Sequence, residues 1–281
     1  MKQFLFIFIV LLTSVVYSQN IADSLLNKWI PKGVSGINIS QVSFNNWAQG
    51  GDNSILWVLN GEFGLSYYTK AHSLLNNLKL AYGRPKLGGE SYRTNDNEFY
   101  MENVFSYFVG WVVEPYISNI IRSPISTGYD YKVTPAVKTA DFFDPGYVSQ
   151  SIGFSYSRNK VITTRLGAAF QETFTNKYRQ YTDDPSTLDK IEAFKFETGI
   201  ESVTDLKADL GGNMLIMSEL RLFTRFNHMD VWDVRWDNTI VAQVNNYINV
   251  KLNFLTLYEK SLSAKTQFKE ALLLGFTYTF F

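Results

Sequence analysis

Residues 55–67 read ILWVLNGEFGLSY, and apolar and polar side chains alternate along this stretch. The apolar face comprises Ile55, Trp57, Leu59, Phe63, Leu65 and Tyr67, and the polar face comprises Asn60, Glu62, Gly64 and Ser66. A period of two is typical of a β-strand with one apolar and one polar face. Strands of soluble domains usually have about five or six residues, whereas this segment is long enough to cross a bilayer at a tilt. The stretch therefore predicts a membrane-spanning β-strand.

Similar alternation recurs along the rest of the chain, most clearly in residues 194–202, 216–226, 248–254 and 271–280. We expect twelve such segments, and single-chain bacterial barrels require an even number. The predicted fold is all-β, a single transmembrane antiparallel up-and-down β-barrel of about 12 strands. The expected strands are residues 35–44, 54–68, 73–84, 97–109, 114–124, 147–157, 161–173, 190–202, 213–226, 232–243, 246–258 and 268–281.

The connections between these segments alternate in length, which supports the same fold. The odd-numbered ones include the long stretches 45–53, 85–96, 125–146 and 174–189. The even-numbered ones are short apart from 203–212, where the flanking strands could extend further. Outer-membrane barrels have long extracellular loops and short periplasmic turns. The pattern therefore places both ends of the barrel in the periplasm.

A soluble β-sandwich is the alternative fold, because its strands also alternate. Two features favour the barrel. Aromatic residues make up 16% of the chain, and barrels concentrate them at the two membrane interfaces. The chain also ends on Phe280-Phe281, and we expect the barrel assembly machinery to recognise this C-terminal strand. Phe281 is one residue out of phase with the apolar face of that strand.

Residues 1–18 are predicted to be a signal peptide. Lys2 provides a positive start, Phe4 to Val16 forms an apolar run of 13 residues, and a small residue, Ser18, precedes the expected cleavage point. A membrane anchor is the alternative, but the run is short for a span of about 20 residues. No comparable run follows, so a helical membrane protein is not expected. Residues 19–281 are then the barrel domain, in the outer membrane of a Gram-negative bacterium, with a short helix possible at 21–30.

Composition excludes several kinds of function. With 26 basic and 26 acidic residues the chain is balanced, which argues against a nucleic-acid partner. Cysteine is absent, so disulfides and thiol chemistry are excluded. No phosphate-binding glycine loop opens a helix, and no metal or other cofactor is expected. Outer-membrane lipid and lipopolysaccharide are the expected surroundings.

Charged residues on the polar faces are expected to line the barrel interior. Seven are acidic and seven are basic. Charges in a barrel interior must be paired with an opposite charge or hydrated. A strongly ion-selective pore would instead carry rings of one sign. The predicted lining residues are Glu62, Lys79, Glu102, Arg165, Lys195, Glu197, Glu201, Glu219, Arg221, Arg225, Asp233, Arg235, Asp237 and Lys251.

No catalytic group of residues is predicted, and the chain is not expected to be an enzyme. Glu197 and Glu201 would lie about 13 Å apart along one strand, too far for an acid–base pair. His228 falls in an outer loop, roughly 33 Å of strand rise from Ser218, so these two cannot react together. His72 falls in a periplasmic turn. The acidic loop residues around 141–144 and 183–184 are expected to be solvated rather than to bind cations.

One motif resembles a known family. Residues 41–54 read QVSFNNWAQGGDNS and are similar to the N-W-x-x-G-G-x-N-S signature of the domain of unknown function 3078 family, which occurs in Bacteroidota. Residues 29–33, 96–99 and 144–156 also resemble that family. The resemblance implies an outer-membrane β-barrel and implies no activity. Physically, the motif would shape the first extracellular loop or bind a ligand there, through Asn46, Trp47, Gly50, Gly51 and Asn53.

Three functions follow from this sequence. The first is a small pore or transporter for hydrophilic solutes, with residues 125–146 narrowing the passage. The second is a structural or interaction barrel with a plugged lumen that works through its outer loops. The third is an outer-membrane lipid hydrolase. The identity of the solute does not follow from the sequence.

Overall fold

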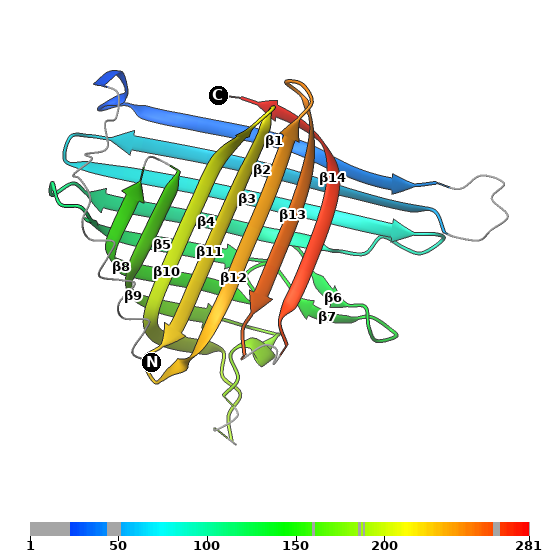
Figure 1. Ribbon diagram of the computed structural model, residues 1–281. Coiled ribbons are helices and arrows are strands. Elements are labelled where there is room, and N and C mark those ends of the chain that lie inside the picture. The colour runs from blue at the N-terminus through cyan, green and yellow to red at the C-terminus, as the bar shows by residue number, and fades with distance from the viewer. Residues whose placement is uncertain are drawn as a thin grey trace.

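The computed structural model describes residues 23–43, 52–158, 161–184, 187, 189–260 and 265–280 (Figure 1). The predicted signal peptide lies outside these residues, and so do Asn46, Trp47, Gly50 and Gly51 of the loop motif. Among the described residues, no helix is long and apolar enough to cross a membrane.

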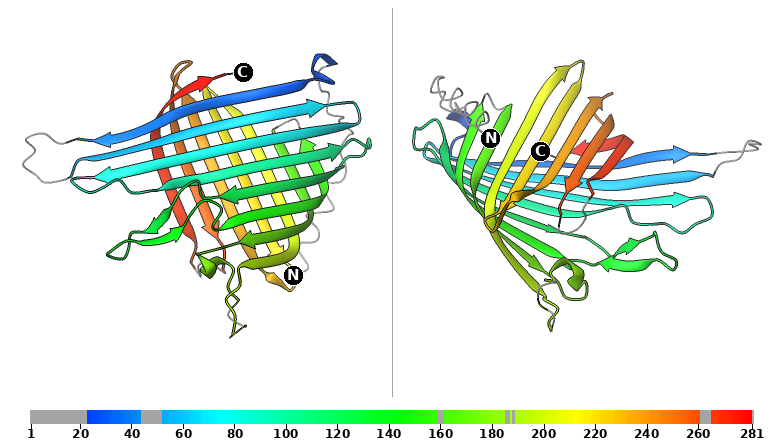
Figure 2. Two further views of the ribbon diagram at one scale, coloured as in Figure 1. Left: turned by 180° about the vertical axis from the view of Figure 1, so that it is seen from behind. Right: turned by 60° about the horizontal axis from the view of Figure 1, so that its bottom comes forward.

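Twelve antiparallel strands close into one barrel, so the predicted fold is confirmed. Around the barrel the order is β1-β14-β13-β12-β11-β10-β9-β8-β5-β4-β3-β2, which is the chain order of an up-and-down barrel. The strands are β1 (Trp29–Val42), β2 (Ser54–Tyr68), β3 (His72–Leu87), β4 (Asp96–Tyr107), β5 (Glu114–Ser123), β8 (Gly146–Arg158), β9 (Ile162–Phe174), β10 (Phe194–Gly211), β11 (Met214–Arg225), β12 (His228–Gln243), β13 (Ile248–Tyr258) and β14 (Gln267–Thr279). The front and back walls cross at a steep angle in both views of Figure 2, as strands tilted in a closed barrel must.

The segment 203–212, expected to be a connection, is part of strand β10. This strand runs to Gly211, and a tight turn follows in which Gly211, Gly212 and Asn213 all adopt positive φ. Charged residues on its inner face, such as Asp205 and Lys207, obscured the alternation in the sequence. Because β10 extends to Gly211 and β11 begins at Met214, the connection between them is a short turn. It lies at the end of the barrel where the predicted topology places short periplasmic turns.

The first strand also begins earlier than expected. β1 starts at Trp29, whose ring centroid lies 4.9 Å from that of Tyr67 on β2. The helix expected over 21–30 is reduced, among its described residues, to the single 3₁₀ turn η2 (Asp23–Leu25). Because the residues from Trp29 pair with β2, they gain backbone hydrogen bonds that an isolated short helix could not match.

Strands β1 and β14 close the barrel along a short seam. They pair from Val34 with Thr279 to Ile39 with Leu274, whereas β1 and β2 pair along the whole of β1. Gly36 allows this closure, because a Cβ atom there would lie 2.4 Å from the carbonyl oxygen of Phe276.

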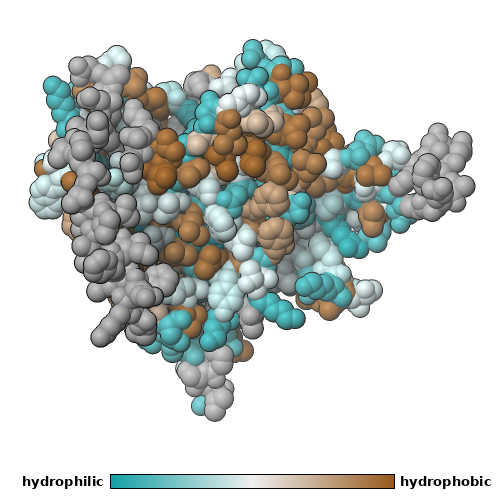
Figure 3. Space-filling view, viewed as in Figure 1, coloured by the Kyte–Doolittle hydropathy of each residue, from teal (hydrophilic) through white to brown (hydrophobic). Residues whose placement is uncertain are grey.

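The two faces of the wall differ in polarity. Large apolar side chains are exposed on the outside, and Figure 3 shows them gathered over the wall that contains β12 to β14. Among them are Trp236, Leu272 and Phe276, which are 46%, 63% and 41% exposed. The inner face holds buried polar residues, including Arg165, Glu201 and Arg221. This arrangement is that of a barrel whose outer face meets lipid.

A second small sheet stands outside the barrel. Strands β6 (Gly128–Asp130) and β7 (Val137–Ala140) form a hairpin within the long connection between β5 and β8. The hairpin projects beyond the strand ends in Figures 1 and 2.

Candidate functional site: the charged barrel interior

Ion pairs cross the interior between opposite walls. Lys79 Nζ of β3 lies 3.3 Å from Glu219 Oε2 of β11, and Arg235 Nη2 of β12 lies 3.0 Å from Glu98 Oε1 of β4. Each pair joins strands that are six positions apart in a ring of twelve, the greatest separation possible. These side chains therefore reach across the full width of the barrel.

A second group centres on Arg165 of β9. Its Nη2 lies 2.6 Å from Glu102 Oε1 of β4 and 3.7 Å from Asp205 Oδ2 of β10. The guanidinium also lies over the ring of Tyr116, with Cζ 6.0 Å from the ring centroid. The Arg165 side chain is only 6% exposed, so these contacts replace the water it loses on burial.

A buried pair lies beside this group. Arg221 of β11 donates from Nε to Glu201 Oε2 of β10 over 2.7 Å. The two side chains are 6% and 2% exposed, so Glu201 is among the most deeply buried groups of the described chain. Burial of such a carboxylate is possible because a guanidinium on the adjacent strand holds it.

A third group lies toward the ends of the strands that carry the long connections. Arg225 contacts Glu197 on β10, and its Nη2 lies 2.8 Å from Asp233 Oδ2 on β12. Lys195 Nζ lies 3.0 Å from Glu197 Oε1. Glu197 thus binds two cations and is not paired with Glu201, which agrees with the expectation that these carboxylates do not form a dyad.

Thirteen of the fourteen predicted lining residues take part in ion pairs. The exception is Lys251, for which the described part of the chain holds no carboxylate at ion-pair distance. The thirteen, with their partners, are Glu62 (Lys32), Lys79 (Glu219), Glu102 (Arg165), Lys195 (Glu197), Glu201 (Arg221), Arg225 (Asp233) and Arg235 (Asp237).

Sequence reasoning missed several interior charges. Lys269 of β14 contacts Asp96 of β4 across the interior, and Asp205 and Glu98 belong to the groups above. Glu98 could have been predicted from the sequence, because it lies on the same face of β4 as Glu102. Asp205 was missed because its segment was expected to be a connection. Arg122 of β5 was also missed.

The connection 125–146, which was expected to narrow the barrel interior, begins on the outside of the wall. Asn97 accepts hydrogen bonds at Oδ1 from the backbone N–H groups of Ile125 (2.9 Å) and Ser126 (2.8 Å). Asn97 is in phase with Phe99 on the outer face of β4, opposite to Glu98. The start of the connection is therefore tied to the outside of the wall and not to the charged interior.

Asp144 joins two of the long connections. Its carboxylate accepts hydrogen bonds from the backbone N–H groups of Asn176 (2.9 Å) and Lys177 (2.8 Å), which follow β9. Burial raises the pKa of Asp144, but these donors together with the N–H of Tyr178 outweigh burial and hold the pKa below its ordinary value. The acidic residues here thus have a structural partner, and the described residues contain no cluster suited to a metal ion.

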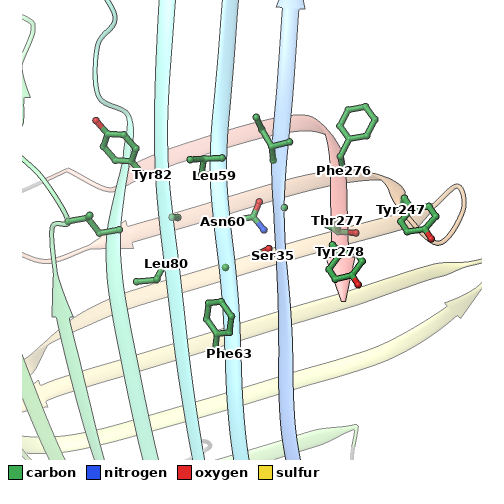
Figure 4. Close-up of a pocket in the computed structure, with 15 residues that line it drawn as sticks. Ser35, Leu59, Asn60, Phe63, Leu80, Tyr82, Tyr247, Phe276, Thr277 and Tyr278 are labelled. Carbon is green, nitrogen blue, oxygen red and sulfur yellow. The ribbon is translucent and has the colours of Figure 1, made fainter. Parts of the chain in front are cut away.

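A depression of about 750 Å³ lies by the β1–β14 seam (Figure 4). Its lining includes Leu59, Phe63, Tyr82, Phe276 and Tyr278, and Figure 4 shows that these side chains come from β2, β3 and β14. These residues are in phase with the apolar outer face. The depression therefore belongs to the lipid-facing side, and it brings together no acid, base and nucleophile.

The residues weighed for hydrolysis are not brought together. Ser218 Oγ donates to Asn238 Oδ1 over 2.7 Å and accepts from Trp236 Nε1 over 3.0 Å. His228 begins β12, ten residues from the Asn238 that pairs with Ser218. The other histidine, His72, has Nδ1 3.1 Å from the Thr69 hydroxyl in the turn before β3.

Comparison with known families supports the resemblance that the motif in residues 41–54 indicates. Residues 39–129 match the family described as "Protein of unknown function (DUF3078)". The resemblance to this family is confirmed over that segment. No curated protein matches the chain.

Several solved barrels are similar to this chain over most of its length. The translocator domain of the autotransporter NalP from Neisseria meningitidis is 8% identical, with 92% of this chain and 91% of that one covered, at a TM-score of 0.37. The COG4313 outer membrane channel from Pseudomonas putida F1 is 11% identical, with coverage of 93% and 99% and a TM-score of 0.39. The CymD monoaromatic hydrocarbon channel is 10% identical, with coverage of 91% and 89% and a TM-score of 0.35. With TM-scores this low, these likenesses carry no argument about the function of this chain.

Proposed function

We propose that this protein is an outer-membrane channel that passes small hydrophilic solutes or ions through a narrow, charged interior. Its strands are long enough to cross a bilayer, and its outer face is apolar while its inner face is charged. In a membrane, such a barrel buries its apolar outer face in lipid. Its inner wall is then a surface for water and polar solutes.

The cross-barrel ion pairs carry this proposal. Lys79 and Glu219 meet across the barrel, yet the Lys79 side chain is 43% exposed. Glu98, in the other cross-barrel pair, is 42% exposed. Side chains that meet across the lumen and still contact solvent support the proposal of a constricted but hydrated passage. The constriction limits the size of a solute, and the paired charges of both signs favour no strong selectivity by charge at this level.

Single-channel recording in planar bilayers tests the proposal. We expect discrete conductance steps from the folded barrel, and a rise in step size of about twofold or more when Lys79→Gln and Glu219→Gln are combined. The double variant keeps the net charge but removes the bridge across the lumen. The matched control combines Lys32→Gln with Glu62→Gln, a 3.8 Å pair between the adjacent strands β1 and β2, and should change the step much less.

A second candidate is a barrel that works through its outer loops. Asp144 supports it, because this residue ties the β7–β8 and β9–β10 connections into one ordered surface. A correctly folded barrel that shows no conductance, even with the Lys79–Glu219 bridge removed, would contradict the channel and leave this candidate.

The remaining assignments are part of the same proposal. The family resemblance of residues 39–129 and the alternation of loop lengths support a location in the outer membrane, where lipopolysaccharide would form the outer leaflet. The C-terminal strand β14 is then the segment that the barrel assembly machinery would bind. No reaction is proposed, because the described side chains bring no catalytic group together.

A further inference from the structure

The outer face of β3 changes in character toward the end of the strand. The residues that follow one another on this face are Leu78, Leu80, Tyr82, Arg84 and Lys86. The end that carries the two cations lies on the same side of the barrel as the β6–β7 hairpin (Figures 1 and 2). Apolar, aromatic and basic side chains in this order match the hydrocarbon, interface and headgroup layers of a bilayer.

Aromatic pairs at both ends of β2 agree with this placement. Trp57 of β2 and Tyr82 of β3 have ring centroids 6.0 Å apart. At the opposite end, the ring centroids of Trp29 and Tyr67 are 4.9 Å apart. Trp57 and Tyr67 are ten residues apart on one strand, and a tilted strand crosses the hydrocarbon in about 9–11 residues. Arg84, which pairs with Trp57 in the strand register, therefore lies at the level of the lipid headgroups.

The two cations are gathered at one aromatic ring. Arg84 Cζ lies 5.9 Å and Lys86 Nζ 5.7 Å from the centroid of the Tyr92 ring. Arg84 Nη2 also donates to the Tyr92 carbonyl oxygen over 2.9 Å, which holds the guanidinium in place. The carboxylate of this connection, Glu90, is held by Arg93 at 2.7 Å. In the part of the chain that the structure describes, no carboxylate lies at ion-pair distance from either outward-facing cation.

The apolar depression of about 750 Å³ lies next to these cations, on the side toward the hydrocarbon. Tyr82 lines the end nearest to them, and two residues of strand rise, about 7 Å, separate it from Arg84. In Figure 4 the depression extends from Tyr82 on β3 to Phe276 and Tyr278 on β14. A volume of this size falls in the range of ligand pockets, about 300–1,000 Å³.

We propose that this surface binds lipid A, the phosphorylated anchor of lipopolysaccharide, with a phosphate between Arg84 and Lys86 and an acyl chain in the depression. Arg and Lys bind phosphate through charge-assisted hydrogen bonds. Cations beside an apolar depression favour an amphiphilic anion over free phosphate, because one lipid molecule fills both places. The inference rests on the outer-membrane location in the proposed function, and it adds a specific lipid partner to the channel.

Native mass spectrometry of the folded full-length barrel in detergent tests the site, with purified lipid A as the probe. We expect one retained lipid A molecule per barrel, and an affinity at least about tenfold lower when Arg84→Gln and Lys86→Gln are combined. The matched control combines Lys28→Gln with Lys70→Gln. These two exposed lysines lie just outside β1 and β2 at the opposite end of the barrel, and their removal should leave the affinity near that of the native protein.

Two further measurements separate the headgroup from the acyl chain. Lipid A from which both phosphates have been removed should bind the native protein as weakly as intact lipid A binds the Arg84→Gln, Lys86→Gln variant. Ser35 lines the depression, so Ser35→Leu should fill part of it and lower the affinity for lipid A without any loss of charge. The heat-dependent mobility of each variant on gels confirms that it is folded.

Each outcome bears on one part of the inference. Equal losses in the two double variants would overturn the site, since the effect would be one of net charge. Equal retention of phosphatidylglycerol would overturn the choice of lipid A, and unchanged binding in Ser35→Leu would overturn the place of the acyl chain. Lipid A retained by a barrel that does not conduct would support the site and overturn the channel. A conducting barrel that retains no lipid A would overturn the site alone.

Discussion

Replacement of Glu201 by Gln should destabilise the barrel strongly. Gln keeps the size of the side chain but removes the negative charge and replaces one acceptor oxygen by an NH2 donor. Arg221, whose side chain is 6% exposed, would then be a buried cation without its counter-ion. Breaking one side of a buried pair costs about 3–5 kcal/mol, so we expect the free energy of unfolding to fall by about this amount. A loss of 3 kcal/mol lowers the folding equilibrium constant by roughly a hundredfold.

The same substitution at an exposed ion pair serves as the reference for the loss of unfolding free energy. Glu62 pairs with Lys32 over 3.8 Å, and these side chains are 43% and 58% exposed. Exposed pairs contribute about 0–1 kcal/mol, so Glu62→Gln should change the free energy of unfolding by no more than this. The two variants thus lose the same charge from the same inner wall, and differ in burial.

Urea unfolding of the folded barrel in lipid vesicles, followed by tryptophan fluorescence, measures both changes. A third variant combines Glu201→Gln with Arg221→Met and removes both charges. It should recover much of the lost stability, because no buried charge then lacks a partner. Equal losses in Glu201→Gln and Glu62→Gln, or a double variant no better than the single one, would refute the reasoning.

Two further predictions concern the loops and the seam. Asp144→Asn should speed proteolysis within residues 175–193, while Asp183→Asn on the same connection should not. Because the folded pKa of Asp144 is lowered, its contribution to loop stability is present above the ordinary Asp pKa of about 3.9 and is lost as the pH falls through the folded value, which proteolysis by an acid-active protease can follow. At the seam, cysteines at Ser35 and Tyr278, which pair directly, should form a disulfide in this cysteine-free chain. A gel-mobility shift reports it, and an equally efficient cross-link from a position two residues earlier on β14 would contradict the register.

Much of the architecture could be predicted from local pattern. Each of the twelve strands shows its own period-two alternation, so their number and inner faces follow from residues close together in the chain. The strand expected at 54–68 coincides with β2. The prediction was wrong where the pattern was weak, as in residues 203–212, whose inner face carries Asp205 and Lys207.

The pairing of the interior charges could not be predicted in this way. Lys79 and Glu219 are 140 residues apart in sequence, and they meet because the barrel closes with β3 opposite β11. Alternation shows only that both face inward. Which opposite wall a side chain reaches depends on the tilt and stagger of all the strands together, a property of the closed ring.

The sequence alone therefore determined a twelve-stranded barrel with a charged inner wall, because the face on which a residue lies is set by its immediate neighbours. Only the tertiary structure decided that Lys79 and Arg235 bridge the lumen. A side chain on one wall meets a partner on the far wall only when the ring has closed, so these contacts cannot be predicted from neighbouring residues in the chain.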